Sequence, residues 1–307
     1  MRKPLSLGIL TLGVAMLVPA GASAGPITVQ NFVSAASLVN TLVAGAVGIT
    51  VVAGSETYTG DTIAAGTFTG GTNILPFDSG VLLTTGSIQN APGPNNNDGA
   101  GTTNTGGSDA QLDAINGASD IEDAAILQFS FIATQPNISF QYVFASEEYN
   151  EFVNSAFNDV FAFFLNGVNI ALIPGSGSPV AINSVNCGAN SAYYTNNDSG
   201  ASTGGDATCV ANGNPVAGLD TQYDGLAGAG TNPLFWLFAS GTVVPGEINT
   251  IKLAIGDSSD TVLDSGVFLK AGSFVNEPPP AAVPEPATLV LVGLGLAGLA
   301  ARRYRRQ

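Results

Sequence analysis

No histidine occurs in this chain of 307 residues, and it contains only two cysteines and one tryptophan. The absence of histidine removes the usual general base, the Ser-His-Asp arrangement and the commonest zinc ligand. Two cysteines alone do not supply the four ligands of a typical structural zinc site. The sequence therefore excludes the most familiar hydrolase and zinc-binding chemistries.

Basic residues are also scarce: eight lysines and arginines stand against 23 aspartates and glutamates, and six of the eight lie at the chain ends. Only Lys252 and Lys270 remain between Gly25 and Glu285, so this body carries a net charge of 2 − 23 = −21. Such a surface repels nucleic acid and anionic lipid, which argues against nucleic acid as a partner. It favours binding of hard cations, although solubility is an alternative reason for acidic residues.

The first 24 residues have the pattern of a secretory signal peptide. Arg2 and Lys3 form a basic start, an apolar run follows, and small residues lead up to Ala24. The last three of these fit an A-x-A cleavage site. We expect cleavage between Ala24 and Gly25, and export of the body across the inner membrane.

The C-terminal end combines a Pro-rich linker at 276–283 with the motif Pro284, Glu285 and Pro286. An apolar stretch at 287–301 follows, and four arginines lie in the last six residues. A spanning helix needs about 20 residues, so 287–301 predicts a short transmembrane helix with its arginines on the cytoplasmic side. An ordinary tail anchor is the alternative.

This ending, at 284–307, resembles the PEP-CTERM sorting tail of Gram-negative bacteria. The resemblance implies that an exosortase recognises and cleaves the tail, after the helix has held the chain in the membrane. It also implies transfer of the body to the cell surface or extracellular matrix, often in species that make exopolysaccharide.

Cys187 and Cys209 are the only cysteines of a chain that we expect to be exported. Disulfides form and persist in oxidising compartments, so a bond between the two is the natural interpretation. Two free buried thiols are the alternative.

The body between residues 25 and 275 is rich in glycine, asparagine, threonine and β-branched residues, which favours strands and turns over helices. We predict a mainly β domain: an antiparallel, jelly-roll-like β-sandwich with one or two short helices. Asn166 and Gly167, between two apolar runs, predict a tight hairpin. The polar stretch 90–107 predicts a surface loop. Strands are expected near 27–32, 47–53, 81–86, 124–133, 138–145, 159–165, 168–173, 233–239, 249–255 and 266–274. Of these, 124–133 and 138–145, joined by a turn, are the clearest strand pair. Helices are expected at 34–43, capped by Ser34, and at 108–116, capped by Ser108.

Two segments concentrate carboxylates and amides beside predicted strands. A calcium ion takes six to eight oxygen ligands, and loops that are otherwise uncharged offer them here. We predict one or more structural Ca²⁺ ions that tie the segments together. We also predict that the second segment forms a hairpin loop. The alternative is that each acid caps a turn or faces water. The candidate ligands are Glu147, Glu148, Asn158 and Asp159 in the first segment, and Asp257, Asp260 and Asp264 in the second.

The body also resembles the choice-of-anchor L domain, a secreted bacterial module joined to different C-terminal anchors. The resemblance implies an extracellular β-rich domain with no assigned catalytic activity, and it supports calcium because its matched positions include the acidic loops. One departure is that Thr261 and Val262 follow Asp260 where a glycine is expected. The matching strings are 78–87, 142–149, 158–161, 222–225 and 264–268.

The sequence therefore favours a non-enzymatic surface or matrix protein that acts in adhesion or in exopolysaccharide and biofilm structure. Exopolysaccharide or another glycan is a candidate partner through the polar loops. A glycan hydrolase that uses Glu147 and Glu148 as an acid pair is one alternative, although adjacent residues seldom reach the opposed geometry required. A subunit of a surface assembly is another.

Overall fold

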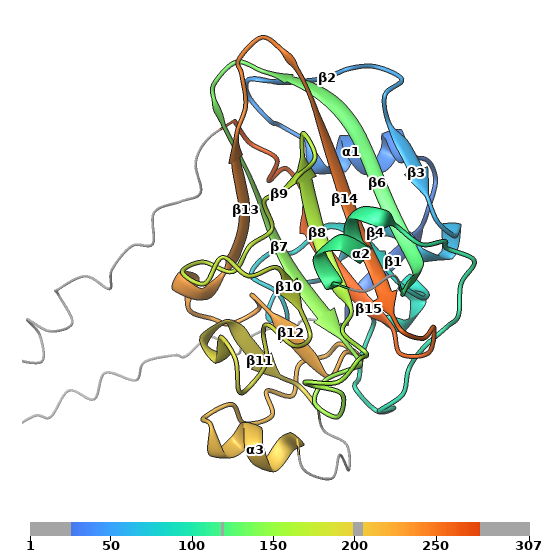
Figure 1. The fold of residues 1–307 in the computed structure, drawn as a ribbon, viewed down its shortest axis with the longest axis vertical. Coiled ribbons are helices and arrows are strands. Elements are labelled where there is room, and N and C mark those ends of the chain that lie inside the picture. The colour runs from blue at the N-terminus through green and yellow to red at the C-terminus, as the bar shows by residue number, and fades with distance from the viewer. Residues whose placement is uncertain (1–25, 118–119, 199–204, 277–307) are drawn as a thin grey trace, which may run out of the picture.

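A computed structural model describes residues 26–117, 120–198 and 205–276 of the protein. Over these residues the chain forms two antiparallel sheets that pack face to face, which confirms the predicted mainly β sandwich (Figure 1). No helix within these ranges is both long and apolar enough to cross a membrane. Several predictions lie outside the described residues: the signal peptide 1–24 with its cleavage after Ala24, the linker from 277 to 283, the tail 284–307 and its helix 287–301.

The larger sheet, here called sheet A, contains eight strands of the described chain. Its order is β1-β4-β5-β15-β7-β12-β11, and β12 and β13 follow one another along one edge of β7. The strands are β1 (Thr28–Asn31), β4 (Ala65–Thr69), β5 (Gly80–Thr84), β7 (Asn137–Ser146), β11 (Tyr194–Asn196), β12 (Gly225–Ala227), β13 (Leu237–Thr242) and β15 (Ser265–Lys270).

The second sheet, sheet B, contains seven strands within the same described ranges. Its order is β10-β8-β14-β6-β2, with β3 paired to β6 and β9 paired to β8. The strands are β2 (Ile49–Val51), β3 (Thr57–Thr59), β6 (Ile121–Ala133), β8 (Val160–Leu165), β9 (Val168–Asn169), β10 (Val180–Ala181) and β14 (Ile248–Ser258).

The main core lies between the sheets and is rich in aromatic side chains. Phe129 and Phe131 alternate along β6, and Phe140 on β7 packs toward them from the other sheet. Phe274 packs against all three rings: its centroid lies 5.5 Å from that of Phe129, 4.8 Å from that of Phe131 and 4.0 Å from that of Phe140. Strand alternation therefore places one apolar face of each sheet in the same core.

Strands 124–133 and 138–145, expected as the clearest neighbouring pair, are both present, but they do not pair with each other. β6 pairs with β14 in sheet B, whereas β7 pairs with β15 in sheet A. The connection at 134–136 therefore carries the chain from one sheet to the other. The aromatic faces of the two strands meet across the sandwich and not along a hydrogen-bonded ladder.

Three α-helices accompany the described strands, where one or two were expected. Ser34 caps the first as predicted, because its hydroxyl accepts a hydrogen bond from the Ser37 N–H at 3.1 Å. The third helix was not predicted, since its seven residues carry little periodic pattern. The helices are α1 (Ala35–Leu42), α2 (Ala110–Asn116) and α3 (Gly205–Ala211), with 3₁₀ turns at Thr62–Ala64, Ile88–Asn90, Ser191–Tyr193 and Pro233–Phe235.

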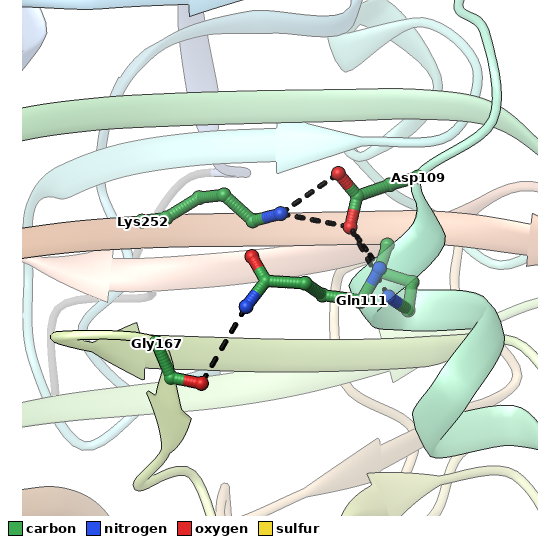
Figure 2. Close-up of polar contacts among 5 residues, drawn as sticks. Asp109, Gln111, Gly167 and Lys252 are labelled. Carbon is green, nitrogen blue, oxygen red and sulfur yellow. Dashed lines mark hydrogen bonds and ion pairs between the residues drawn. The ribbon is translucent and has the colours of Figure 1, made fainter.

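Helix α2 is held against sheet B by polar contacts (Figure 2). Asp109 caps it, and not Ser108 as expected, because the Asp109 carboxylate accepts hydrogen bonds from the Gln111 and Leu112 N–H groups. Asp109 also forms an ion pair of 2.7 Å with Lys252 on β14. A carboxylate therefore serves both the helix end and the lysine, which a serine hydroxyl would not do.

The hairpin predicted at Asn166 and Gly167 is confirmed: it joins β8 to β9. Both residues have positive φ, 49° and 85°, which a tight turn of this kind requires. The predicted disulfide is also confirmed, between Cys187 and Cys209. Asn276, where the linker was expected to begin, is buried and accepts a hydrogen bond of 2.6 Å from the Gln135 N–H.

Candidate metal centre

The strand register of sheet A brings three carboxylates side by side. Ser146, the last residue of β7, pairs with Ser265 on β15 and with Gly225 on β12. The residues just beyond these positions are Glu147, Asp264 and Asp224, and the Glu147 N–H donates to the Asp264 carbonyl at 3.1 Å. These strand ends lie at the lower end of the sandwich in Figure 1.

Sheet B contributes carboxylates at the same end. Val160 pairs with Gly256, so Asp159, just before β8, lies beside Asp257 near the end of β14. The chain then passes Asp260 and enters β15, which belongs to sheet A. This connection crosses between the sheets, so the predicted hairpin loop is wrong: its two flanking strands do not pair.

Glu148, Asp257 and Asp260, here called the crossover cluster, each present a carboxylate oxygen within 4.8 Å of the other two. Glu148 and Asp257 are 1 % and 2 % exposed, whereas Asp260 is half-buried. Glu148 Oε2 and Asp257 Oδ1 are buried without a hydrogen-bond partner. Buried charged atoms are costly unless they are paired or bind a metal, so the cluster has the chemistry of a cation site.

The electrostatics of the crossover cluster also disfavour bare carboxylates. Burial, followed by the charge of Asp159, raises the pKa of Glu148 to about 9. Burial first and the neighbouring Asp159 second also raise the pKa of Asp257 far above its ordinary value. Lys252 binds Asp109 and Lys270 donates to Gln141, so neither lysine of the body neutralises the cluster. Protons or a metal ion must compensate the charge.

Asp159, also a predicted ligand, contacts the cluster through a side-chain hydrogen bond with Asp257, and it also accepts hydrogen bonds from both sheets. Its Oδ1 accepts a hydrogen bond from the Ser258 N–H at 3.0 Å, and its Oδ2 accepts one from the Ser265 hydroxyl at 2.6 Å. Ser258 belongs to sheet B and Ser265 to sheet A. Asp159 therefore joins the two sheets directly and supplies negative charge to the cluster.

Known protein families match both parts of the chain that the sequence had singled out. The choice-of-anchor L domain family matches residues 27–275, which include every strand described above. This chain belongs to the choice-of-anchor L family. A PEP-CTERM protein-sorting motif matches residues 282–306, so both resemblances are confirmed. Neither a curated protein nor a solved structure matches the chain.

Asp264 of this choice-of-anchor L domain is buried but fully engaged. Its carboxylate accepts hydrogen bonds from the Ser87 N–H at 3.1 Å, the Asn90 side chain at 2.8 Å and the Thr102 N–H at 2.8 Å. Burial raises its pKa to about 6, with these donors opposing the shift. A side chain on Gly86 would collide with the Asp264 carboxyl, so the glycine allows this approach. Asp264 therefore anchors a loop and lies outside the crossover cluster.

The stretch 90–107 is a surface loop as predicted, with most residues exposed or half-buried, but two of its residues are buried. Ala91 is fully buried, and Asn104 is 7 % exposed. The Asn104 N–H donates to the Asp123 carboxylate at 3.0 Å, and Thr102 binds Asp264 as described. The loop therefore folds over the acidic end of the choice-of-anchor L domain because buried carboxylates accept its backbone donors.

The remaining predicted ligands are Asn158, whose side chain is held by neighbouring asparagines, and Glu147, which is not among the acids of the crossover cluster. Asn158 Oδ1 accepts from the Asn183 N–H at 2.8 Å, and its Nδ2 donates to Asn116 Oδ1 at 2.8 Å. Glu147 is 2 % exposed with both oxygens unpartnered, and burial, then the charge of Asp224, raises its pKa to about 10. Glu147 thus belongs with the sheet A carboxylates, whereas its neighbour Glu148 belongs to the crossover cluster.

The structure also assembles a group of acids that the sequence did not single out as ligands. Asp98, Asp198 and Asp224 each present a carboxylate oxygen within 4.8 Å of the other two. They come from three separated segments, so no local spacing marks them. The only signal was that Asp224 lies in one of the strings shared with the choice-of-anchor L family.

A cavity of about 440 Å³ lies beside β11 and is lined by both polar and apolar side chains. Trp236 forms part of its wall, with its Nε1 donating to the Gly230 carbonyl at 2.8 Å. Asn214 and Thr231 add polar groups to the same wall. An aromatic ring beside amide and hydroxyl groups is a wall that suits a small amphipathic ligand.

Proposed function

We propose that this protein is a non-enzymatic component of the bacterial surface or extracellular matrix, with a domain that Ca²⁺ stabilises outside the cell. The choice-of-anchor L domain and the PEP-CTERM motif indicate an exported, surface-anchored protein, and the motif is a signal that an exosortase recognises. The finer role, in adhesion or in exopolysaccharide and biofilm structure, is our proposal.

The calcium part rests on one observation: Glu148 and Asp257 each keep a buried, unpartnered oxygen, and their carboxylates come within 4.8 Å of each other where the chain crosses between the sheets. Three carboxylates supply up to six oxygens, and water reaches the half-buried Asp260. Extracellular calcium modules bind with dissociation constants of about 10⁻⁴–10⁻³ M, which suits an exported protein. A bound ion would stabilise the joint between sheets A and B.

The non-enzymatic part is supported by the placement of Glu147 and Glu148. Glycosidases need two carboxyl groups that flank the scissile bond from opposite sides of an accessible cleft. Here both side chains are buried, and they face different carboxylate groups. The cavity beside Trp236 supports contact with a glycan of the matrix.

Fractionation of host cells tests the proposed location and role. With the wild-type chain, we expect the body in the surface and matrix fractions and its tail removed. Replacing Pro284, Glu285 and Pro286 by alanine should leave uncleaved protein at the inner membrane. The matched control replaces three linker prolines, at 278–280, and should behave as wild type.

Cell adhesion and retained exopolysaccharide are measured in the same cultures. Both should fall in the sorting variant and in a strain that lacks the protein. Equal adhesion and equal retained polysaccharide in all strains would contradict the matrix role, even if sorting occurs as expected.

A further inference from the structure

A second group of carboxylates, here called the loop site, lies apart from the crossover cluster. It consists of Asp98 in the loop 90–107, Asp198 just after β11, and Asp224 just before β12. Asp198 and Asp224 are both 0 % exposed, whereas Asp98 is exposed. The three segments thus meet with two buried carboxylates and one that reaches solvent.

An independent observation at Asp224 points to a ligand. Its Oδ1 accepts a hydrogen bond from the Asn95 side chain at 2.7 Å, but its buried Oδ2 has no partner. Burial, and then the charges of Asp198, Glu151 and Asp98, raise the pKa of Asp224 to about 8, while Asn95 opposes the shift. A buried carboxylate oxygen beside further acids needs a positive charge that the protein does not supply.

The surroundings hold these three segments in position. Asn95 also donates to the Asn197 carbonyl at 2.9 Å, and Gln222 donates to the Asn97 carbonyl at 2.8 Å. Asn197 in turn donates to the Tyr223 carbonyl at 2.9 Å. Hydrogen bonds therefore bring the backbones together around the loop site, while the carboxylates at its centre repel one another.

We propose that Asp98, Asp198 and Asp224 bind a second divalent cation, Ca²⁺, which ties the loop 90–107 to the disulfide-closed segment 187–209. Carboxylate oxygens, with water on the exposed side of Asp98, suit the coordination of Ca²⁺. The site shares no ligand with the crossover cluster, and it rests on the proposed function only for the identity of the cation. Because Asp98 is exposed, this ion should exchange with solvent more readily than one in the crossover cluster.

Calcium titration of the purified full chain in mild detergent, followed by calorimetry, tests the loop site. We expect two binding events for the wild type. Asp98→Asn, at an exposed position that leaves the fold intact, should weaken one event at least tenfold, and Asp224→Asn should abolish it. The matched control is Glu247→Gln, which removes one negative charge at an exposed position far from both groups. It should retain both binding events.

Limited digestion with proteinase K gives a second measurement. Calcium should protect the loop 90–107 from cleavage in the wild type and in Glu148→Gln, but not in Asp98→Asn. Wild-type stoichiometry and wild-type protection in Asp98→Asn and Asp224→Asn together would overturn the loop site. If the wild type lacks only the binding event that depends on Glu148, that result contradicts the crossover cluster and leaves the loop site standing. The two proposals can therefore fail separately.

Discussion

Asp257 and Asp264 lie at the two ends of the crossing from β14 to β15, and each is 2 % exposed. Three donors, from Ser87, Asn90 and Thr102, bind the Asp264 carboxylate. Asp257 instead keeps an unpartnered oxygen and lies among other acids. The two aspartates thus lie in the same connection and at the same depth, but only the charge of Asp264 is compensated by hydrogen-bond donors.

The difference teaches that burial alone does not mark a metal ligand. Hydrogen bonds to a carboxylate stabilise its charged form, so Asp264 can remain ionised without a cation. Where donors are missing, the carboxyl must keep a proton or bind a metal. The donor set therefore separates an acid that anchors the loop 90–107 from acids that are candidates for binding Ca²⁺.

The largest effect is expected for Asp264→Ala, which removes the acceptor of the Ser87 and Thr102 N–H groups and one of the two acceptors of the Asn90 side chain. These donors are half-buried, and hydrogen bonds to a charged group contribute about 1.5–3 kcal/mol each, so the free energy of unfolding should fall by roughly 3–5 kcal/mol. Urea unfolding of the full chain measures this loss, with Asp78→Ala, at an exposed acid, as the control. The loss should be equal in calcium and in chelator, and a loss that vanishes in chelator would make Asp264 a calcium ligand.

A smaller effect, which depends on the medium, is expected for Asp257→Asn. In chelator, the raised pKa keeps a proton on Asp257, so replacing this neutral carboxyl by an amide should leave the free energy of unfolding nearly unchanged. In calcium at 100 times the dissociation constant, bound ion stabilises the wild type by about 2.7 kcal/mol, which the variant should lose. Urea unfolding in the two media checks this contrast. The same difference between variant and wild type in both media would remove the crossover cluster as a cation site.

Much of the fold follows from local patterns in the sequence. Alternating aromatic residues identify β6 and β7, and Asn166 with Gly167 marks the turn between β8 and β9. The error of pairing β6 with β7 has a physical cause: alternation shows which face of a strand is buried, but not which strand forms hydrogen bonds with it. Both strands bury an aromatic face in one core, so their patterns agree with either arrangement.

The candidate site was predictable only in part, because its geometry depends on strand register. Glu148, Asp257 and Asp260 were singled out as acids beside strands, and the structure brings them together. The donors to Asp264 come from residues more than 160 positions away, and no local spacing announces them. The loop site combines segments in the same way, so its acids looked like isolated loop residues.

The smallest effect expected concerns the pH dependence contributed by Glu148 alone. In the unfolded chain Glu148 releases its proton near its ordinary pKa of about 4.5. In the folded protein its pKa is about 9, raised mainly by burial and further by the charges of Asp159, Asp260 and Glu151. Between these values the folded state binds more protons, so the contribution to stability is complete below pH 4.5 and is lost as the pH rises through 9.

In chelator, the free energy of unfolding of the wild type should therefore fall between pH 6 and pH 7 more steeply than that of Glu148→Gln, by about 1 kcal/mol. In saturating calcium the two slopes should converge, because the ion replaces the proton on Glu148. Urea unfolding at the two pH values measures both slopes. Parallel slopes in chelator would mean that Glu148 stays charged without an ion, and the contrast between Asp264 and the crossover cluster would lose its electrostatic basis.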